Sequence, residues 1–214
     1  GIAHELRNGL KPIAGSVEEP CRLEQEWLGR TRTPSHGPLE QLCPVSVVAP
    51  CLGACARAPG LPQETAPSVF VIERDLEGAT VARGEFSAIN GVRRGFTVYL
   101  EGVRSGDTFT LTERFEYDDG ERDHKTWVLT LEGNGQYTGT REDLVGAARG
   151  WQDGPAFRLE YDVRLPGENG EPGMKVRFRD VMVKTADGRV LNHASVGKWG
   201  VRVASVELVI EQAP

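Results

Sequence analysis

The chain has 214 residues, of which 26 are glycine and 7% are aromatic, and its formal net charge is −6. This length suits one domain with an extension. The negative charge argues against a nucleic-acid partner, because nucleic-acid-binding domains usually concentrate Lys and Arg. No stretch approaches the roughly 18 consecutive apolar residues expected of a membrane-spanning helix.

Residues 1–67 differ in composition from the rest of the chain. They hold all four cysteines and show little strand alternation. Cys51 and Cys55 form one close pair, but no second close Cys or His pair accompanies them, so no metal site is expected. We expect a poorly structured extension, leader or tether over residues 1–67, followed by a single domain over residues 68–214.

The segment LCPVSVVAPCLGAC (residues 42–55) supports two interpretations of this extension. Small residues before Cys55, after an apolar run, are typical of a bacterial lipoprotein cleavage site, where the cysteine becomes the lipidated N-terminus. Two prolines interrupt the run, and Glu40 stands where a positive charge is expected, so a proline-rich linker is the alternative. The first interpretation predicts a periplasmic lipoprotein that meets the membrane only through its lipid, and the second predicts a cytoplasmic protein.

From residue 68 onward, apolar and polar residues alternate as they do in β-strands. Strands are expected within residues 69–72, 79–89, 94–101, 108–117, 122–131, 136–142, 156–165, 174–183, 189–196 and 201–211, with a Gly/Ala-rich passage at 145–150. Tight Asn-Gly and Asp-Gly turns leave no room for crossover helices. Such a meander forms a sandwich or a barrel, and its regularity favours an all-β, single up-and-down, lipocalin-like barrel of about 8–10 strands.

Two acidic residues fall where the alternation predicts an inward, apolar face. Glu113 stands between Leu111 and Phe115, and Asp180 follows Phe178 at the same spacing. A carboxylate among apolar neighbours must be hydrogen-bonded, paired, protonated or in contact with water in a cavity. These two acids therefore mark the candidate functional site.

Two interpretations of these acids remain open. In one, they belong to a polar cluster inside a mostly apolar ligand cavity, where desolvation raises their pKa values. In the other, Glu113 forms a buried ion pair with Arg94 or Lys125 that fixes strand register. The ligand-binding residues predicted under the first interpretation are Arg94, Glu113, Phe115, Tyr117, Trp127, Tyr161, Phe178, Asp180 and Asn192.

Short motifs from about residue 69 to the C-terminus resemble one bacterial family. They include LEG (76–78), GEF (84–86), ERFEY (113–117), WVL (127–129), YTGT (137–140), VGAARG (145–150) and KWG (198–200). Their order and spacing are similar to those of the domain of unknown function, family 3833, whose members include lipoproteins. The resemblance implies a lipocalin-like barrel in the cell envelope, and it brings no established chemistry. Trp151 and Trp199 flank turns, where such residues either rim the barrel mouth or plug the closed end; by likeness to lipocalins, the plug is favoured for Trp199 beside Lys198.

Three functions follow from these features. The first is a non-catalytic barrel that binds a hydrophobic or amphipathic small molecule or lipid, without a cofactor. The second is a cofactor-free isomerase, cyclase or hydratase that uses Glu113 or Asp180 as general acid or base. The third is a structural envelope protein with a fully packed barrel. The sequence indicates neither the ligand nor the oligomeric state.

Overall fold

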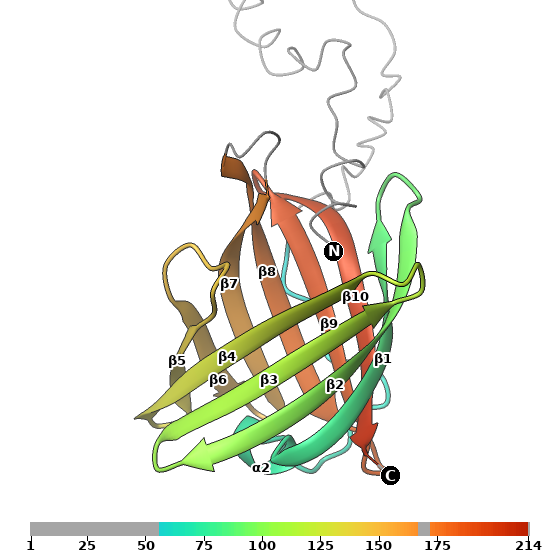
Figure 1. Cartoon of the computed structure of the whole chain (residues 1–214). Coiled ribbons are helices and arrows are strands. Elements are labelled where there is room, and N and C mark those ends of the chain that lie inside the picture. The colour runs from blue at the N-terminus through green and yellow to red at the C-terminus, as the bar shows by residue number, and fades with distance from the viewer. Residues whose placement is uncertain (1–55, 167–171, 214) are drawn as a thin grey trace, which may run out of the picture. The chain divides into compact units, whose positions relative to one another are not determined.

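The computed structural model describes residues 56–166 and 172–213. In this part of the chain, ten antiparallel strands close into a barrel (Figure 1). The strands are β1 (Gly78–Ala88), β2 (Arg93–Ser105), β3 (Thr108–Tyr117), β4 (Arg122–Gly133), β5 (Gln136–Thr140), β6 (Ala148–Asp153), β7 (Ala156–Pro166), β8 (Pro172–Lys184), β9 (Val190–Lys198) and β10 (Val201–Gln212). One short helix, α2 (Ile72–Asp75), precedes them.

The strand order follows the sequence. Each strand pairs with the next one, and β1 pairs with β10 to close the ring. Closure leaves no free sheet edge, so the backbone polar groups of the wall are satisfied within the barrel. The predicted all-β, up-and-down, lipocalin-like barrel is confirmed.

Two elements differ from the sequence prediction. Residues 69–72 were expected to be a strand, but they lead into α2. The Gly/Ala-rich passage was not assigned a strand, but β6 begins within it at Ala148. The inward-facing residues of β6 are small because neighbouring side chains already fill the barrel interior beside them. A Cβ atom at Gly150 would lie 2.7 Å from the ring of Phe157 and 3.3 Å from the Cβ of Tyr137.

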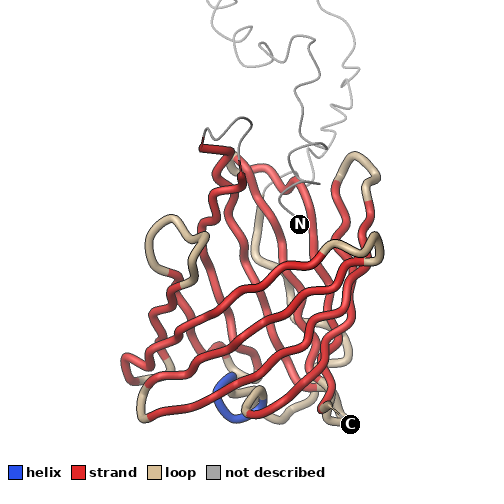
Figure 2. Tube along the Cα trace, viewed as in Figure 1, coloured by secondary structure: helices blue, strands red, loops and turns tan. Residues whose placement is uncertain are grey.

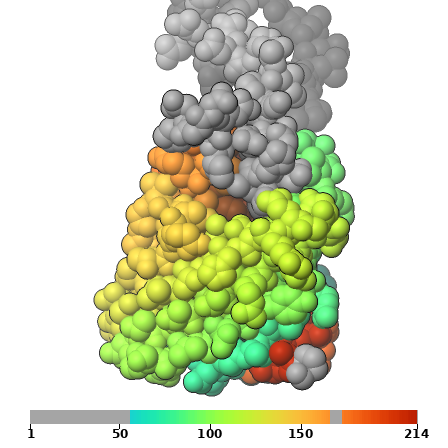
Figure 3. Space-filling model, in the orientation of Figure 1, coloured from blue at the N-terminus to red at the C-terminus, as the bar shows by residue number. Residues whose placement is uncertain are grey.

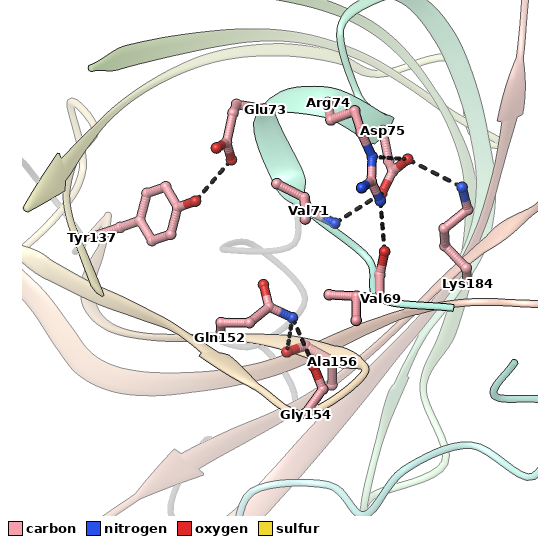
Figure 4. Close-up of polar contacts among 10 residues, drawn as sticks. All are labelled: Val69, Val71, Glu73, Arg74, Asp75, Tyr137, Gln152, Gly154, Ala156 and Lys184. Atoms are coloured by element: carbon pink, nitrogen blue, oxygen red, sulfur yellow. Dashed lines mark hydrogen bonds and ion pairs between the residues drawn. The ribbon is translucent and has the colours of Figure 1, made fainter. Parts of the chain in front are cut away.

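Helix α2 closes one end of the barrel. Ile72 and Leu76 are almost fully buried there, and the carbonyl oxygen of Leu76 lies so close to Gly102 that a Cβ at that position would clash with it. Inside the barrel end, the hydroxyl of Tyr137 donates a hydrogen bond of 2.8 Å to the carboxylate of Glu73 on the helix (Figure 4). The helix is therefore a packed plug.

Outside the barrel, residues 56–71 form a strap that runs beside β7, β8 and β9 before it enters the plug (Figure 2). The amide of Ala56 donates to the carbonyl of Gly200 at 2.7 Å, and the amide of Ala66 donates to that of Lys184 at 2.7 Å. Val181 and Val183, which face outward on β8, are fully buried beside it. The packed domain therefore already includes residues 56–67, which the sequence placed in the extension.

Polar contacts hold the lower end of the strap to the wall. Asp75 accepts a hydrogen bond from the amide of Val71 at 2.8 Å and forms an ion pair with Lys184 at 3.1 Å (Figure 4).

In the space-filling view, the side chains of β2, β3 and β4 cover the wall that faces the viewer (Figure 3). Within the described residues, no helix has the length and apolar character needed to cross a membrane.

Candidate functional site

The barrel encloses a cavity of about 410 Å³. Its floor includes Ile72 and Leu76 of the plug, and its other end includes Arg122, Asp123 and Arg164. These three charged residues lie at the ends of strands remote from α2, so the cavity opens at the end opposite the plug. The volume falls within the roughly 300–1,000 Å³ that is usual for small-molecule sites.

Glu113 reaches the cavity because the alternation of β3 continues through it. In the sheet it lies opposite Leu100 on β2 and Lys125 on β4. The pKa of its carboxyl is raised to about 7, chiefly by burial; the charges of Arg141 and Lys125 oppose this rise, and the nearby carboxylates of Asp143 and Glu142 add to it. Near neutral pH, this carboxyl can therefore hold or release a proton.

Asp180 faces the same cavity from β8 and is 6% exposed. The hydroxyl of Tyr161 donates to its Oδ2 atom at 3.3 Å. Burial raises the pKa of Asp180 to about 7, although the charge of Arg141, the hydrogen bond from Tyr161 and the nearby side-chain amide of Asn192 oppose the shift. Its second oxygen, Oδ1, has no hydrogen-bond partner, and neither has Oδ1 of Asn192.

The positive charge of Arg141 acts on both acids, although Arg141 was not among the predicted site residues. Its Nε and Nη2 atoms donate to the carboxylate of Asp143 at 2.7 and 3.2 Å. Its guanidinium carbon lies 4.6 Å from the ring centroid of Trp127 and 5.2 Å from that of Tyr161. Burial opposes its charge, but nearby Tyr161, Asp143 and Glu113 outweigh burial and raise the pKa of the guanidinium.

A signal for Arg141 was present in the sequence. Tyr137 and Gly139 face inward on β5, so the same alternation carried one step past the end of that strand puts Arg141 on the inner face. The predicted partners of Glu113 were Arg94 and Lys125 instead.

Neither of those two cations forms an ion pair with Glu113. Lys125 pairs with Asp123, Glu142 and Asp143 at 3.5, 3.8 and 3.6 Å. Arg94 binds Asp119 and Glu121 at 2.6 and 2.7 Å and lies 3.8 Å above the ring of Tyr117. The structural ion pair that was the alternative to a binding site is therefore not formed.

Most of the predicted ligand-binding residues lie together. The eight that line the cavity are Glu113, Phe115, Tyr117, Trp127, Tyr161, Phe178, Asp180 and Asn192. Arg94 is not part of the cavity lining, because its guanidinium is directed toward Asp119 and Glu121. The rings of Tyr161 and Phe178 stack with centroids 5.1 Å apart, and Trp127 meets Tyr161 edge-on at 4.9 Å.

The predicted plug at Trp199 is wrong. Trp199 is 90% exposed in the turn between β9 and β10, with the ammonium of Lys198 4.0 Å from its ring centroid. Helix α2, and not Trp199, closes the barrel.

Cys55, the candidate lipidation site, lies outside the described residues. Among the described residues, no group of three or more His, Cys, Asp or Glu is arranged to hold a metal ion.

We compared the sequence with known protein families. The family described as a protein of unknown function (DUF3833) matches residues 49–212. The chain belongs to this family. No curated protein is significantly similar to this DUF3833 member.

Solved structures similar to the DUF3833 barrel share little sequence with it. The S-type phycobiliprotein lyase CPES from Guillardia theta is 6% identical with a TM-score of 0.48, over 67% of this chain and 91% of the lyase. Rv2717c from M. tuberculosis is 12% identical with a TM-score of 0.48, over 65% of this chain and 94% of its own. The redesigned β-barrel mFAP1, bound to DFHBI, is 8% identical with a TM-score of 0.34, over 65% and 97%. These likenesses concern the barrel fold and carry no ligand or reaction over to the DUF3833 chain.

Proposed function

We propose that the barrel binds a small amphipathic molecule in its cavity. The observation that carries the proposal is the combination, in one open-ended cavity, of apolar walls with a single polar cluster. Leu111, Leu159 and Phe178 belong to the apolar lining, and Glu113 and Asp180 to the polar one. Mostly apolar walls with a few convergent polar groups are the usual composition of a ligand site, since the apolar part supplies affinity and the polar part orientation.

The size of the cavity limits the ligand. At about 410 Å³ it stands near the lower end of the usual range for small-molecule sites. This space suits one aliphatic chain or a molecule of a few rings better than a lipid with two acyl chains. We therefore favour a single-chain or compact ring ligand over a lipid with two chains.

Native mass spectrometry of the full chain, purified from a bacterial host, tests this function. We expect a non-covalent adduct of defined mass that is released on mild activation, or uptake of single-chain lipids or isoprenoids added to the protein. A clean apo mass with no uptake of either class would indicate a packed structural barrel and overturn the proposal.

Two variants make the test specific for the cavity. Ala194 lines it from β9, directly opposite Asp180 in the sheet. Ala194→Phe should fill the space and abolish the adduct, because a filled core has no room for a ligand. The same change at exposed Ala147 should leave the adduct intact. Retention of the adduct by folded Ala194→Phe would place the ligand elsewhere.

A cofactor-free isomerase, cyclase or hydratase is the second candidate. It is favoured by two cavity carboxyls whose pKa values lie near 7, as a general acid or base requires. Glu113→Gln separates the two functions. A binder should carry the same molecule before and after the change, with altered affinity, whereas an enzyme variant that still binds should accumulate a substrate in place of the product. Identical bound species in both proteins would argue against catalysis by Glu113.

We also propose that Cys55 anchors the barrel to the cell envelope. The support is the apolar run and small residues before Cys55, together with the strap, which begins at Ala56 beside Gly200 at the open end. A lipid on Cys55 would hold the cavity entrance close to a membrane. Metabolic labelling with a radioactive fatty acid should mark the wild type and Cys51→Ala, but not Cys55→Ala. Labelling of Cys55→Ala, or none in the wild type, would contradict the anchor.

A further inference from the structure

The cavity wall offers hydrogen-bond acceptors that have no donor. Oδ1 of Asp180 and Oδ1 of Asn192 are both buried and unpartnered. In the sheet, Asp180 lies opposite Ala194 and Asn192 lies opposite Met182, so the two are diagonal neighbours on the inner face of β8 and β9. Buried acceptors without donors are costly, and in native proteins they are expected to be satisfied by water or a ligand.

Three donor side chains of the wall already have acidic partners. The hydroxyl of Tyr161 donates to the other oxygen of Asp180 at 3.3 Å. Arg141 gives two of its nitrogens to Asp143, at 2.7 and 3.2 Å. Lys125 is shared among three acidic side chains nearer the cavity entrance. A hydrogen-bond donor inside the cavity would satisfy these unpartnered oxygens.

The charges around Arg141 also favour a ligand head group that donates a hydrogen bond over an anionic one. One guanidinium interacts there with three carboxyl groups, those of Asp143, Glu113 and Asp180. A ligand carboxylate or phosphate would add a negative charge beside these acids in a desolvated site, and the repulsion is largest when Glu113 and Asp180 are ionised. A head group that carries a positive charge or a polar hydrogen has the opposite, favourable interaction.

We infer that the head group bound beside Asp180 and Asn192 is a hydrogen-bond donor, an amine or a hydroxyl, and not a carboxylate or a phosphate. This inference rests on the proposed function, because it presumes that a ligand occupies the cavity. It narrows the ligand class to apolar amines and alcohols, and it makes Asp180 the residue that selects between head groups.

A series of ligands that differ only in the head group tests the inference on the full wild-type chain. Decylamine, decanol and decanoate compete at neutral pH with the neutral fluorophore N-phenyl-1-naphthylamine. We expect decylamine and decanol to displace the fluorophore at concentrations about ten-fold or more below that of decanoate, the ratio expected for one charge-assisted hydrogen bond.

The outcomes separate the inference from the function on which it rests. Displacement by decanoate at equal or lower concentration would overturn the donor head group and leave the binding function standing. Failure of the fluorophore and of all three ligands to bind would overturn the binding function itself.

Asp180→Asn then tests the residue. The change keeps the shape of the side chain and removes its charge, so the preference for decylamine over decanoate should fall about ten-fold, while decanol changes less. Asp153→Asn makes the same chemical change at an exposed position on β6 and should leave the preference unaltered. An unchanged preference in folded Asp180→Asn would remove Asp180 from head-group selection.

Discussion

Arg141 and Asp143 form a two-pronged ion pair at the cavity wall, with Nε–Oδ1 and Nη2–Oδ2 distances of 2.7 and 3.2 Å. The pair orients the guanidinium so that the rings of Trp127 and Tyr161 lie over it. Its position lowers the pKa values of Glu113 and Asp180, which burial alone would raise further. The cation is therefore central to the electrostatics of the whole polar cluster.

Arg141→Met should destabilise the fold strongly. It removes the guanidinium that Asp143, Glu113 and Asp180 share, and breaking a buried ion pair typically costs about 3–5 kcal/mol of unfolding free energy. Arg149→Met is the matched control, because Arg149 is exposed on β6 with its guanidinium 5.6 Å from the ring of Trp151. Urea unfolding should show a change below about 1 kcal/mol for the control. Equal effects of the two changes would contradict the central role of Arg141.

Glu113 should make the protein less stable as the pH rises. Its pKa is about 7 in the folded chain against an ordinary 4.5, so between these values the folded state binds more protons than the unfolded state. The free energy of unfolding therefore falls as pH rises through this window, and the contribution of Glu113 is fully lost above it. A pKa difference of one between the folded and unfolded states corresponds to about 1.4 kcal/mol, so this contribution has an upper limit of about 3 kcal/mol.

Glu113→Gln should remove this part of the pH dependence. At about pH 8.5 the variant is expected to be more stable than the wild type by about 1–3 kcal/mol, with a difference near zero at about pH 4. Urea titrations at both pH values measure it. Glu116→Gln, a change on the outer face of the same strand, should show no such gain. A gain that is the same at both pH values would refute the raised pKa as its cause.

Tyr137→Phe should loosen the plug. The change removes the donor of the buried 2.8 Å hydrogen bond to Glu73 and leaves that carboxylate without it, at a cost of about 1–3 kcal/mol. Amide hydrogen exchange should accelerate in α2 before it does in the strands. Tyr99→Phe, at an exposed position on β2, is expected to stay within about 0.5 kcal/mol of the wild type. Unchanged exchange in α2 would show that the helix is held by packing alone.

Trp199→Gly should be tolerated. A tryptophan that plugs a core contributes about 3–5 kcal/mol, but this one is exposed and adopts a left-handed backbone with φ of 51°, which glycine accepts more readily. We expect thermal unfolding to change by the equivalent of less than about 1 kcal/mol. A loss of several kcal/mol would restore the plug that the structure contradicts.

The barrel could be predicted because its strands alternate clearly. The pattern also places Glu113 and Asp180 on the inner face, and both line the cavity. Strand β6 was missed because its inward positions, Ala148 and Gly150, are small to fit the large side chains opposite, so they carry no apolar signal. A residue's size can be set by neighbours that are distant in sequence, which periodicity cannot detect.

The polar partners were harder to predict than the strands. Register puts Lys125 directly opposite Glu113, but its ammonium reaches toward the cavity entrance and pairs with Asp143 and its neighbours. A long flexible side chain can choose among several acids, and only the three-dimensional arrangement decides which. The plug was mislocated for a related reason, because four helical residues next to a strap leave almost no pattern in the sequence.

The strap and plug also constrain the order of events during synthesis. Residues 56–76 leave the ribosome before any strand, but their partners Pro155, Lys184 and Gly200 are made much later. The ring likewise closes only when β1 pairs with the 12 residues of β10. Both steps join chain segments that are far apart in sequence, and such contacts form slowly. Until β10 emerges, helix α2 has no closed barrel to pack against. Closure of the barrel and packing of α2 into its end therefore belong to the same late stage of folding.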